Sequence, residues 1–290
     1  FVTADSKKQE ILGKKVINIL SFIDLEGRLL LFNGLNKTDD RLWLVDETRI
    51  YINTPWEKTD VECIVCNNKN TYFREAEFAP FLKERMFENE NVSTKLIHCP
   101  KCDIYYSYYR PNEKEVERFY SGYRNKEYQL QRQYYEPGYT EEFNRNLFAP
   151  INGGVVRKKR MATIVEKYIN CSICKNILDF GGDKGQFIPD IFPKANKFVY
   201  EISGTDVLED IHLITNLQDL KNYRWDVIFC NMVMEHISDI TLYFKELTDC
   251  MSEGTLLYCE VPFENQMEFI REVYIHDHIN FFRKRTFQYL

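Results

Sequence analysis

The stretch Asn176-Ile-Leu-Asp-Phe-Gly-Gly-Asp-Lys-Gly185 decides the fold. It begins with a short apolar run that is typical of a buried strand, and it ends in a glycine-rich turn. Gly181 lets the backbone turn tightly and approach a ligand. Gly185 lets the next segment, predicted to be helical over residues 186–191, start close to the sheet. The stretch therefore predicts a strand, a turn and a helix that carry a ligand loop.

Short apolar runs continue to alternate with amphipathic stretches after this loop, which is the pattern of βαβ units and a mostly parallel sheet. The predicted strands are residues 176–180, 197–202, 211–215, 226–231 and 255–261. A helix is predicted before the first strand, and another follows the fourth with Ser238 or Asp239 as its N-cap. The pattern predicts an α/β fold with a Rossmann-like sheet.

The helix before the first strand carries the basic run Arg157 to Arg160. Such a run usually forms a solvated helix face, and we expect that here. A clamp for a phosphate group is the less favoured alternative.

A carboxylate at the end of the second strand indicates a nucleoside ligand. Glu201 lies 20 residues after Gly181, where an acidic side chain accepts hydrogen bonds from ribose hydroxyls. A dinucleotide fingerprint, G-x-G-x-x-G, would need glycine where Asp183 and Gln186 stand. The spacing thus favours a nucleoside other than a dinucleotide.

Four of the nine cysteines form two matched pairs, Cys63-Ile-Val-Cys66 and Cys99-Pro-Lys-Cys102. Each pair can present two thiolates to one tetrahedral ion, which predicts a closed and therefore structural zinc site. His98 is a less favoured substitute ligand. The pair Cys171 and Cys174 has no partner pair nearby, and we expect it to serve core packing.

The formal charge of −6 and the pI of about 5.6 argue against nucleic acid as a partner. Small molecules or sugars fit better. No apolar run is long enough to span a membrane, and the layout of a signal peptide is absent near Phe1. We expect a cytoplasmic protein, and the lack of an initiator Met suggests a piece of a longer polypeptide with further domains.

The loop at residues 179–185 resembles the D-x-G-x-G-x-G loop of class I S-adenosylmethionine (SAM)-dependent methyltransferases, with Asp183 where the middle glycine would be. The stretch Asn231-Met-Val-Met-Glu235-His236-Ile-Ser-Asp239 is similar to the E-H-x-x-D signature of the same superfamily. The resemblance implies SAM as the methyl donor. The residues expected to hold it are Asp179, Gly181, Gly182, Gly185, Glu201, Asn231 and Glu235.

Two further stretches narrow the resemblance. The segment after the second cysteine pair looks like methyltransferases of bacterial sugar and polysaccharide pathways, and His276-Asp277-His278-Ile-Asn-Phe-Phe is similar to the H-E-H-x-x-Y-F stretch of deoxysugar C-methyltransferases. The implied acceptor is a nucleotide-linked sugar or a glycan, methylated on carbon or oxygen. His278 is the expected general base, His276 is the alternative base, and Asp277 is expected to orient the ring.

Three units are expected along the chain. Residues 1–57 form a small α/β segment of unknown role, residues 58–130 the zinc module with a substrate-side segment, and residues 131–290 the methyltransferase domain. The final antiparallel strands of such a domain are expected beyond Leu290. Two other functions stay open: a non-catalytic methyltransferase-like module of a polysaccharide-assembly protein, and an NAD-dependent oxidoreductase.

Overall fold

The computed structural model describes residues 10–11, 14–15, 56–88, 91–146, 154–204, 206–262 and 274–290. Most of the predicted N-terminal segment, residues 1–57, lies outside these ranges. Within it, β1 (Glu10–Ile11) pairs antiparallel with β2 (Lys14–Lys15). A search of the described ranges for a helix of sufficient length and apolarity to cross a membrane finds none.

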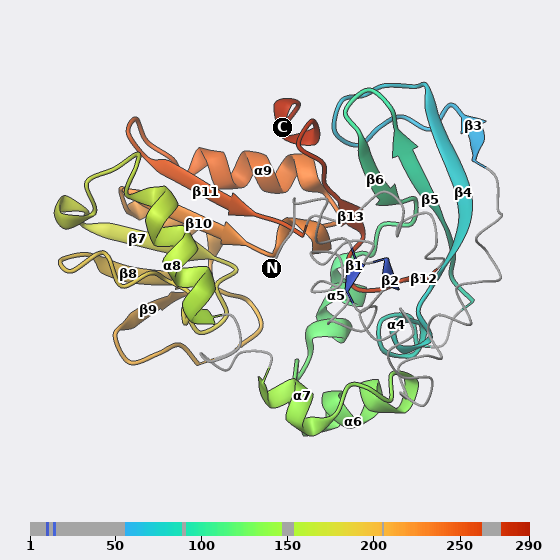
Figure 1. Ribbon diagram of the computed structural model, residues 1–290, viewed down its shortest axis with the longest axis horizontal. Helices are drawn as coiled ribbons and strands as arrows, with labels where there is room; N and C mark the ends of the chain where they lie inside the picture. The colour runs from blue at the N-terminus through green and yellow to red at the C-terminus, as the bar shows by residue number, and fades with distance from the viewer. Residues whose placement is uncertain are drawn as a thin grey trace.

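A five-stranded parallel sheet forms one half of the molecule, on the left in Figure 1. Its strands are β7 (Asn176–Phe180), β8 (Asn196–Tyr200), β9 (Ile211–Ile214), β10 (Val227–Asn231) and β11 (Leu256–Glu260). These strands and the α/β fold class confirm the sequence prediction. The order is β11-β10-β7-β8-β9, so the chain runs outward from β7 on one side and returns to β10 on the other. Ligands bind open α/β sheets at such a switch point, beyond the carboxyl ends of the strands.

Two helices cover opposite faces of this sheet, because successive side chains of a strand point to opposite sides. Helix α8 (Gly154–Val165) shares a buried cluster with Ile177, Val199, Val227 and Phe229. Helix α9 (Ile240–Asp249) shares another cluster with Leu178, Phe198, Ile228 and Cys230. The predicted N-cap of α9 is confirmed, since Asp239 Oδ1 accepts a hydrogen bond from Leu242 N at 2.9 Å.

The helix predicted over residues 186–191 is wrong. These residues form turns after Gly185. Pro189 and Pro193 explain the difference, because a proline lacks the N–H that a helix needs and disfavours helical geometry in the residue before it.

An antiparallel sheet forms the other half, on the right in Figure 1. Its main strands are β3 (Glu57–Thr59), β4 (Thr71–Phe78), β5 (Ser93–Cys99) and β6 (Ile104–Ser107). Two short strands from the far end of the chain complete it: β12 (Tyr274–Ile275) runs parallel to β4, and β13 (Asn280–Phe281) runs antiparallel to β6. The predicted catalytic stretch at residues 276–278 therefore lies between two strands of the cysteine-bearing sheet.

Short helices follow the strands of this second half. They are α4 (Pro80–Arg85), α5 (Glu113–Tyr120), α6 (Lys126–Tyr135) and α7 (Glu141–Asn146). The described residues also form four 3₁₀ turns: η5 (Cys171–Ile173), η6 (Leu217–Asn222), η7 (Met234–His236) and η8 (Thr286–Gln288). Asn112 caps α5, because its side chain accepts from Glu115 N while Glu115 reaches back to Asn112 N.

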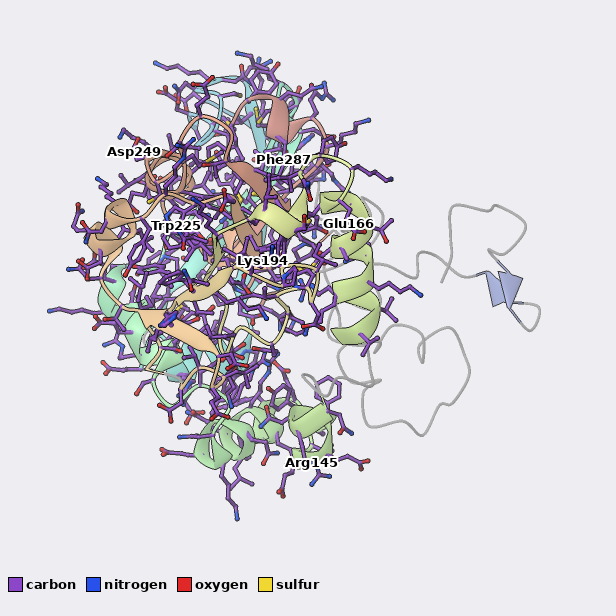
Figure 2. The ribbon with its side chains drawn as sticks, turned by 90° about the vertical axis from the view of Figure 1, so that its left-hand side faces the viewer. Arg145, Glu166, Lys194, Trp225, Asp249 and Phe287 are labelled. Carbon is purple, nitrogen blue, oxygen red and sulfur yellow. The ribbon has the colours of Figure 1, made fainter. Side chains whose placement is uncertain are left out.

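One buried cluster joins the two halves. It includes Cys63, Cys99 and Cys102 as well as the α9 side of the parallel sheet. Trp225, labelled in Figure 2, is fully buried in the same cluster. Its indole Nε1 donates to Leu220 O at 3.1 Å. The cysteine-bearing half and the parallel sheet therefore share a hydrophobic core.

Candidate functional site

The loop after β7 needs glycine at three positions for steric reasons, namely Gly181, Gly182 and Gly185. A Cβ on Gly182 would lie 2.6 Å from the carboxyl carbon of Asp179. A Cβ on Gly185 would lie 2.3 Å from Ile211 Cδ1, and its φ of +77° is one that glycine adopts readily. The loop can thus lie close to the buried Asp179 and to the neighbouring strand β9.

Asp183 occupies the position of the missing glycine with a glycine-like backbone. Its φ is +51°, in the left-handed region that aspartate tolerates better than most residues. Its carboxylate Oδ2 accepts from Gln186 Nε2 at 3.0 Å. The side chain at this position is therefore held by a neighbour within the same turn.

Glu201 lies directly after β8 and is tied to the same loop. Its Oε2 accepts from Asp183 N at 3.1 Å, and its Oε1 accepts from Ile202 N and Ser203 N at 2.9 and 3.0 Å. A carboxylate offers about four lone-pair positions. These three bonds leave Oε2 with room for one further donor.

Asn231 ends β10 beside Asp179, at the switch point of the sheet. Its Nδ2 lies 3.5 Å from Asp179 Oδ1, and its Oδ1 is buried with no hydrogen-bond partner among the described residues. Burial raises the pKa of Asp179 to about 7, although the charge of Arg157 opposes this shift. A buried acceptor without a donor is costly, so this corner suits a ligand that brings N–H or O–H groups.

Arg157 does not fit the predicted solvated helix face. Its side chain is only 18% exposed, and its Nε lies 3.2 Å from Glu260 Oε1 at the end of β11. Arg160, on the same face of α8, pairs with the same oxygen at 2.5 Å. Because Arg157 and Arg160 are three residues apart, the sequence could have shown that they share one face of the helix. Their contact with Glu260 depends on the tertiary fold.

His236 and His278 come together from different segments. Their ring centroids are 4.8 Å apart at an interplanar angle of 73°, and His236 Nδ1 donates to the backbone carbonyl of Asp277 at 2.9 Å. Glu235 is buried beside them, and one ligand atom from each of the three residues lies within 4.8 Å of the others. A carboxylate and two imidazoles thus form one cluster at the end of β10.

His276 takes a different position from His278. Its Nδ1 lies 3.7 Å from Glu136 Oε1, and Glu136 also pairs with the buried Arg132 at 2.9 Å. Asp277 lies between the two histidines in the chain. Burial alone would raise its pKa, but the charges of His278, Arg132 and the other histidines hold the pKa of Asp277 below its usual value.

Tyr120 is a neighbour of this cluster that sequence reasoning missed. Its ring packs edge-on against His236 with centroids 6.4 Å apart, and burial raises the pKa of its hydroxyl well above the usual value. Nothing in a chain with 19 tyrosines marks this one. Its place depends on α5 packing against η7.

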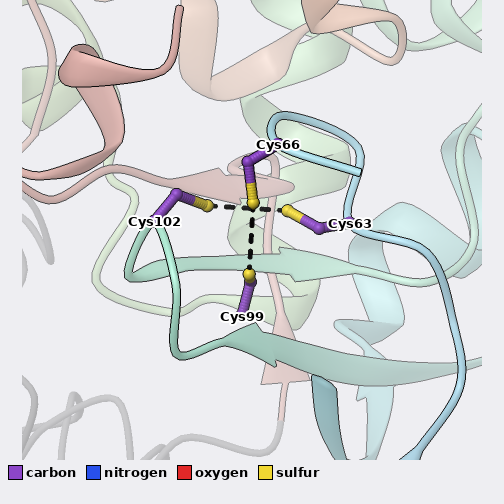
Figure 3. Close-up of side chains that lie close together, drawn as sticks. All are labelled: Cys63, Cys66, Cys99 and Cys102. Atoms are coloured by element: carbon purple, nitrogen blue, oxygen red, sulfur yellow. Dashed lines mark hydrogen bonds between the residues drawn. The ribbon is translucent and has the colours of Figure 1, made fainter. Parts of the chain in front are cut away.

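The four predicted metal ligands converge on one point (Figure 3). The Sγ atoms of Cys63 and Cys102 are 3.5 Å apart, and those of Cys66 and Cys99 are 3.6 Å apart. A tetrahedron with zinc–sulfur bonds of about 2.3 Å has edges of about 3.8 Å. The arrangement fits one zinc ion.

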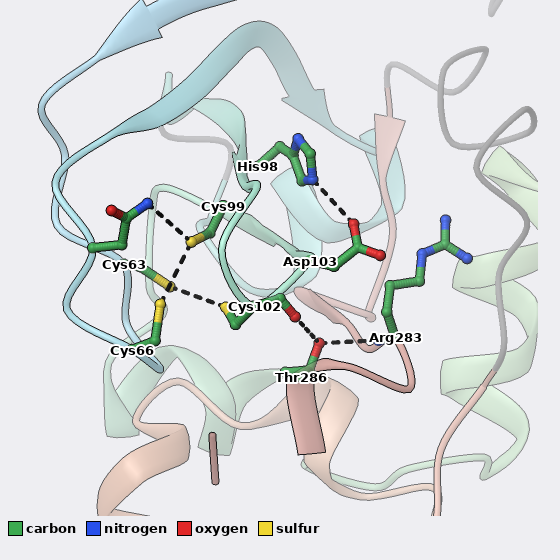
Figure 4. Close-up of polar contacts among 9 residues, drawn as sticks. Cys63, Cys66, His98, Cys99, Cys102, Asp103, Arg283 and Thr286 are labelled. Atoms are coloured by element: carbon green, nitrogen blue, oxygen red, sulfur yellow. Dashed lines mark hydrogen bonds and ion pairs between the residues drawn. The ribbon is translucent and has the colours of Figure 1, made fainter. Parts of the chain in front are cut away.

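Neighbouring groups hold the cysteine loops in place (Figure 4). Asn68 Nδ2 donates to Cys99 Sγ at 3.5 Å, and Thr286 Oγ1 donates to the carbonyl of Cys102 at 3.1 Å. His98 Nε2 lies 3.2 Å from Asp103 Oδ1, outside the group of four thiols. Four cysteines without histidine therefore make up this cluster.

A family model described as a methyltransferase domain matches residues 132–290, which is more than half of the chain. The chain belongs to this methyltransferase family. The match confirms the predicted SAM-dependent methyltransferase and sets aside the NAD-dependent oxidoreductase. A search of curated proteins found no match.

Solved structures of methyltransferases are similar to this chain. The plantazolicin methyltransferase BpumL, in complex with a monoazolic desmethylPZN analog and SAH, has 16% identity and a TM-score of 0.37 over 61% of this chain and 75% of its own. A complex of DhpI with SAM and HEP has 10% identity and a TM-score of 0.32 over 44% of this chain and 63% of its own. Likenesses of this size carry neither an acceptor nor a mechanism over to this chain.

The stability of the protein should depend on the protonation of His236. Burial, with the charges of His278 and Arg124, lowers the pKa of His236 to about 4, while an unfolded histidine titrates near pH 6.5. The stabilisation from the neutral ring is complete above pH 6.5 and is lost as the pH falls toward 4. When the pH falls from 7.5 to 5, the free energy of unfolding of the His236→Gln variant should decrease by about 2 kcal/mol less than that of the unaltered protein. Urea unfolding at both pH values measures this, and equal declines in both proteins would contradict it.

Proposed function

We propose that this chain transfers the methyl group of SAM to a carbon or oxygen atom of a nucleotide-linked sugar or a polysaccharide glycan. Membership of the methyltransferase family supports the transfer. The observation that carries the proposal is the approach of His236 and His278 next to the buried Glu235, beyond the end of β10. The sugar or glycan acceptor is supported by the resemblance of residues 276–282 and of the cysteine-bearing segment to sugar methyltransferases.

The residues proposed to hold SAM surround the switch point of the parallel sheet. They are Asp179, Gly181, Gly182, Gly185, Glu201, Asn231 and Glu235. When bound, SAM supplies an electrophilic methyl group on a sulfonium sulfur. The buried Asn231 Oδ1, which has no hydrogen-bond partner among the described residues, fits a ligand that brings a donor to this point.

His278 is proposed to take up the proton of the acceptor. The neighbouring Glu235 carboxylate would stabilise the imidazolium that forms, because opposite charges a few ångströms apart attract strongly in a buried site. Asp277 adds negative charge beside it. His276 is the second candidate base, since it lies next to the buried Glu136 carboxylate.

The same base serves carbon or oxygen methylation. For a carbon acceptor, His278 removes a proton next to a keto group. For an oxygen acceptor, it removes the hydroxyl proton as the oxygen attacks. The stretch His276-Asp277-His278 favours carbon, because residues 276–282 are similar to a stretch of deoxysugar C-methyltransferases.

A non-catalytic role in a polysaccharide-assembly protein is the alternative proposal. Its main support in the sequence is Asp183 at a glycine position. The structure weakens this support, because Asp183 adopts the left-handed backbone of a glycine and bonds Gln186.

The four cysteines are proposed to bind one structural zinc ion in the unit at residues 58–130, next to the methyltransferase unit at residues 131–290. A four-thiolate site is closed, so the ion would hold β5 and the loops at Cys63 and Cys102 together.

Methyl transfer should depend on His278. Candidate keto-sugar nucleotides and glycans incubated with SAM should gain the mass of one methyl group. His278→Ala should lower kcat by about 10²- to 10⁴-fold, which is the usual contribution of a general base. Mass spectrometry of the products measures both effects.

His212→Ala is the matched control, because His212 is exposed on the edge strand β9. This control should keep the activity of the unaltered protein. An undiminished methyl gain with His278→Ala would remove His278 from its role, and failure of every sugar and glycan to gain mass would contradict the acceptor class.

Zinc content should follow the two cysteine pairs. The purified protein should hold one zinc ion per chain, and Cys99→Ser should lose most of it because it removes one of four thiolates. Cys171→Ser is the matched control, since Cys171 belongs to a similar pair but donates to Ile169 O in the core. Elemental analysis measures the zinc, and equal contents in the two variants would contradict the site.

A further inference from the structure

Arg110 lies between the two segments that carry the histidine pair. Its Nε donates to Ser238 O at 2.9 Å and its Nη2 to Ile237 O at 2.6 Å. Its Nη1 donates to Ile279 O at 3.2 Å. The first two carbonyls follow His236 in the chain, and the third follows His278.

Asn280 extends this network. Its Oδ1 accepts from Arg110 Nη2 at 2.7 Å. Its Nδ2 donates to Met234 O at 2.9 Å and to Ile237 O at 2.7 Å. Asn280 is buried, so it ties the start and the end of the 3₁₀ turn η7 to strand β13.

Two further bonds join the histidine segments directly. Ile279 N donates to Glu235 O at 2.8 Å, and His236 Nδ1 donates to Asp277 O at 2.9 Å. Ser107 of β6, in the cysteine-bearing sheet, binds the same carbonyl as Arg110 Nη1, because its N–H donates to Ile279 O at 2.9 Å. The distance between His236 and His278 thus depends on a small set of backbone carbonyls.

The chemistry of this position requires arginine. Among the described residues, the hydrogen-bond partners of Arg110 are all neutral oxygens, including Ser107 O at 3.3 Å. Burial lowers the pKa of Arg110 to about 10, so the side chain is a cation at neutral pH. The planar fork of five N–H donors can serve carbonyls that lie in different directions, whereas the ammonium of lysine has three donors on one atom.

We propose that Arg110 is a positioning residue for methyl transfer, which sets the spacing and orientation of His236 and His278 by holding the carbonyls that follow them. This inference rests on the proposed function, because Arg110 acts through the proposed base. It also gives the cysteine-bearing half a part in the reaction, since Arg110 follows β6 and reaches the loops of the methyltransferase half.

The test measures the arrangement of the two histidine rings and needs no methyl acceptor. The protein is labelled with ¹⁵N-histidine, and long-range ¹H–¹⁵N spectra report the tautomer of each of the five rings. Contacts between ring protons report the approach of His236 to His278. His236→Gln and His278→Gln assign the two signals.

The unaltered protein should show His236 protonated at Nδ1 and in contact with His278. Arg110→Gln should lose this ring contact and give a mixture of His236 tautomers. Arg118→Gln is the matched control, because Arg118 donates to Met86 O within its own half and should leave both signals unchanged. Zinc content and thermal unfolding establish that each variant is folded.

An Arg110→Gln protein with the tautomer and the ring contact intact would overturn the inference. If Arg110→Gln does not fold, Arg110→Lys is read in the same way, because it keeps the charge and loses the fork. The spectra and the activity assay test different statements. If methyl transfer survives His278→Ala, His278 is not the base, but the spectra still show whether Arg110 sets the geometry of the two histidines.

Discussion

Buried backbone carbonyls need donors, and in this protein that requirement fixes the place where the two halves meet. The segments 234–238 and 277–280 lie largely outside the strand pairings, so most of their carbonyls need donors from elsewhere in the fold. Arg110, Asn280 and His236 supply the donors. Each of these side chains bonds across more than 40 residues of sequence, so the cluster forms only when both sheets are in place.

The parallel sheet supplies the other condition for function. Its order places the ends of β7 and β10 side by side, and the glycine loop packs directly on Asp179 there, because a Cβ at Gly182 would lie 2.6 Å from the Asp179 carboxyl carbon. Glu201 bonds the backbone of that loop, and Asn231 faces it from the next strand. The proposed SAM site and the histidine cluster are therefore neighbours at the end of β10, since Glu235 follows Asn231 by four residues.

Local patterns were sufficient to predict the strands of the parallel sheet, the cap at Asp239 and the gathering of the two cysteine pairs. Apolar runs, a capping side chain and a short ligand spacing are each encoded within a few residues. The prediction of a helix after Gly185 was wrong because it gave the apolar pattern more weight than Pro189 and Pro193. Arg157, Tyr120 and Arg110 could not be recognised, because their partners lie on other elements. The return of residues 274–281 to the cysteine-bearing sheet is likewise a tertiary pairing without a local signal.

The account depends on SAM binding at the loop after β7, and calorimetric titration with SAM tests this most directly. It predicts one SAM per chain with a micromolar dissociation constant, and much weaker binding to Gly182→Ala, whose Cβ would displace the Asp179 carboxylate. Gly204→Ala is the control for backbone strain alone, because the φ of Gly204 is +76° and a Cβ there meets no atom within 4 Å. Absence of binding to the unaltered protein at millimolar SAM would contradict the account.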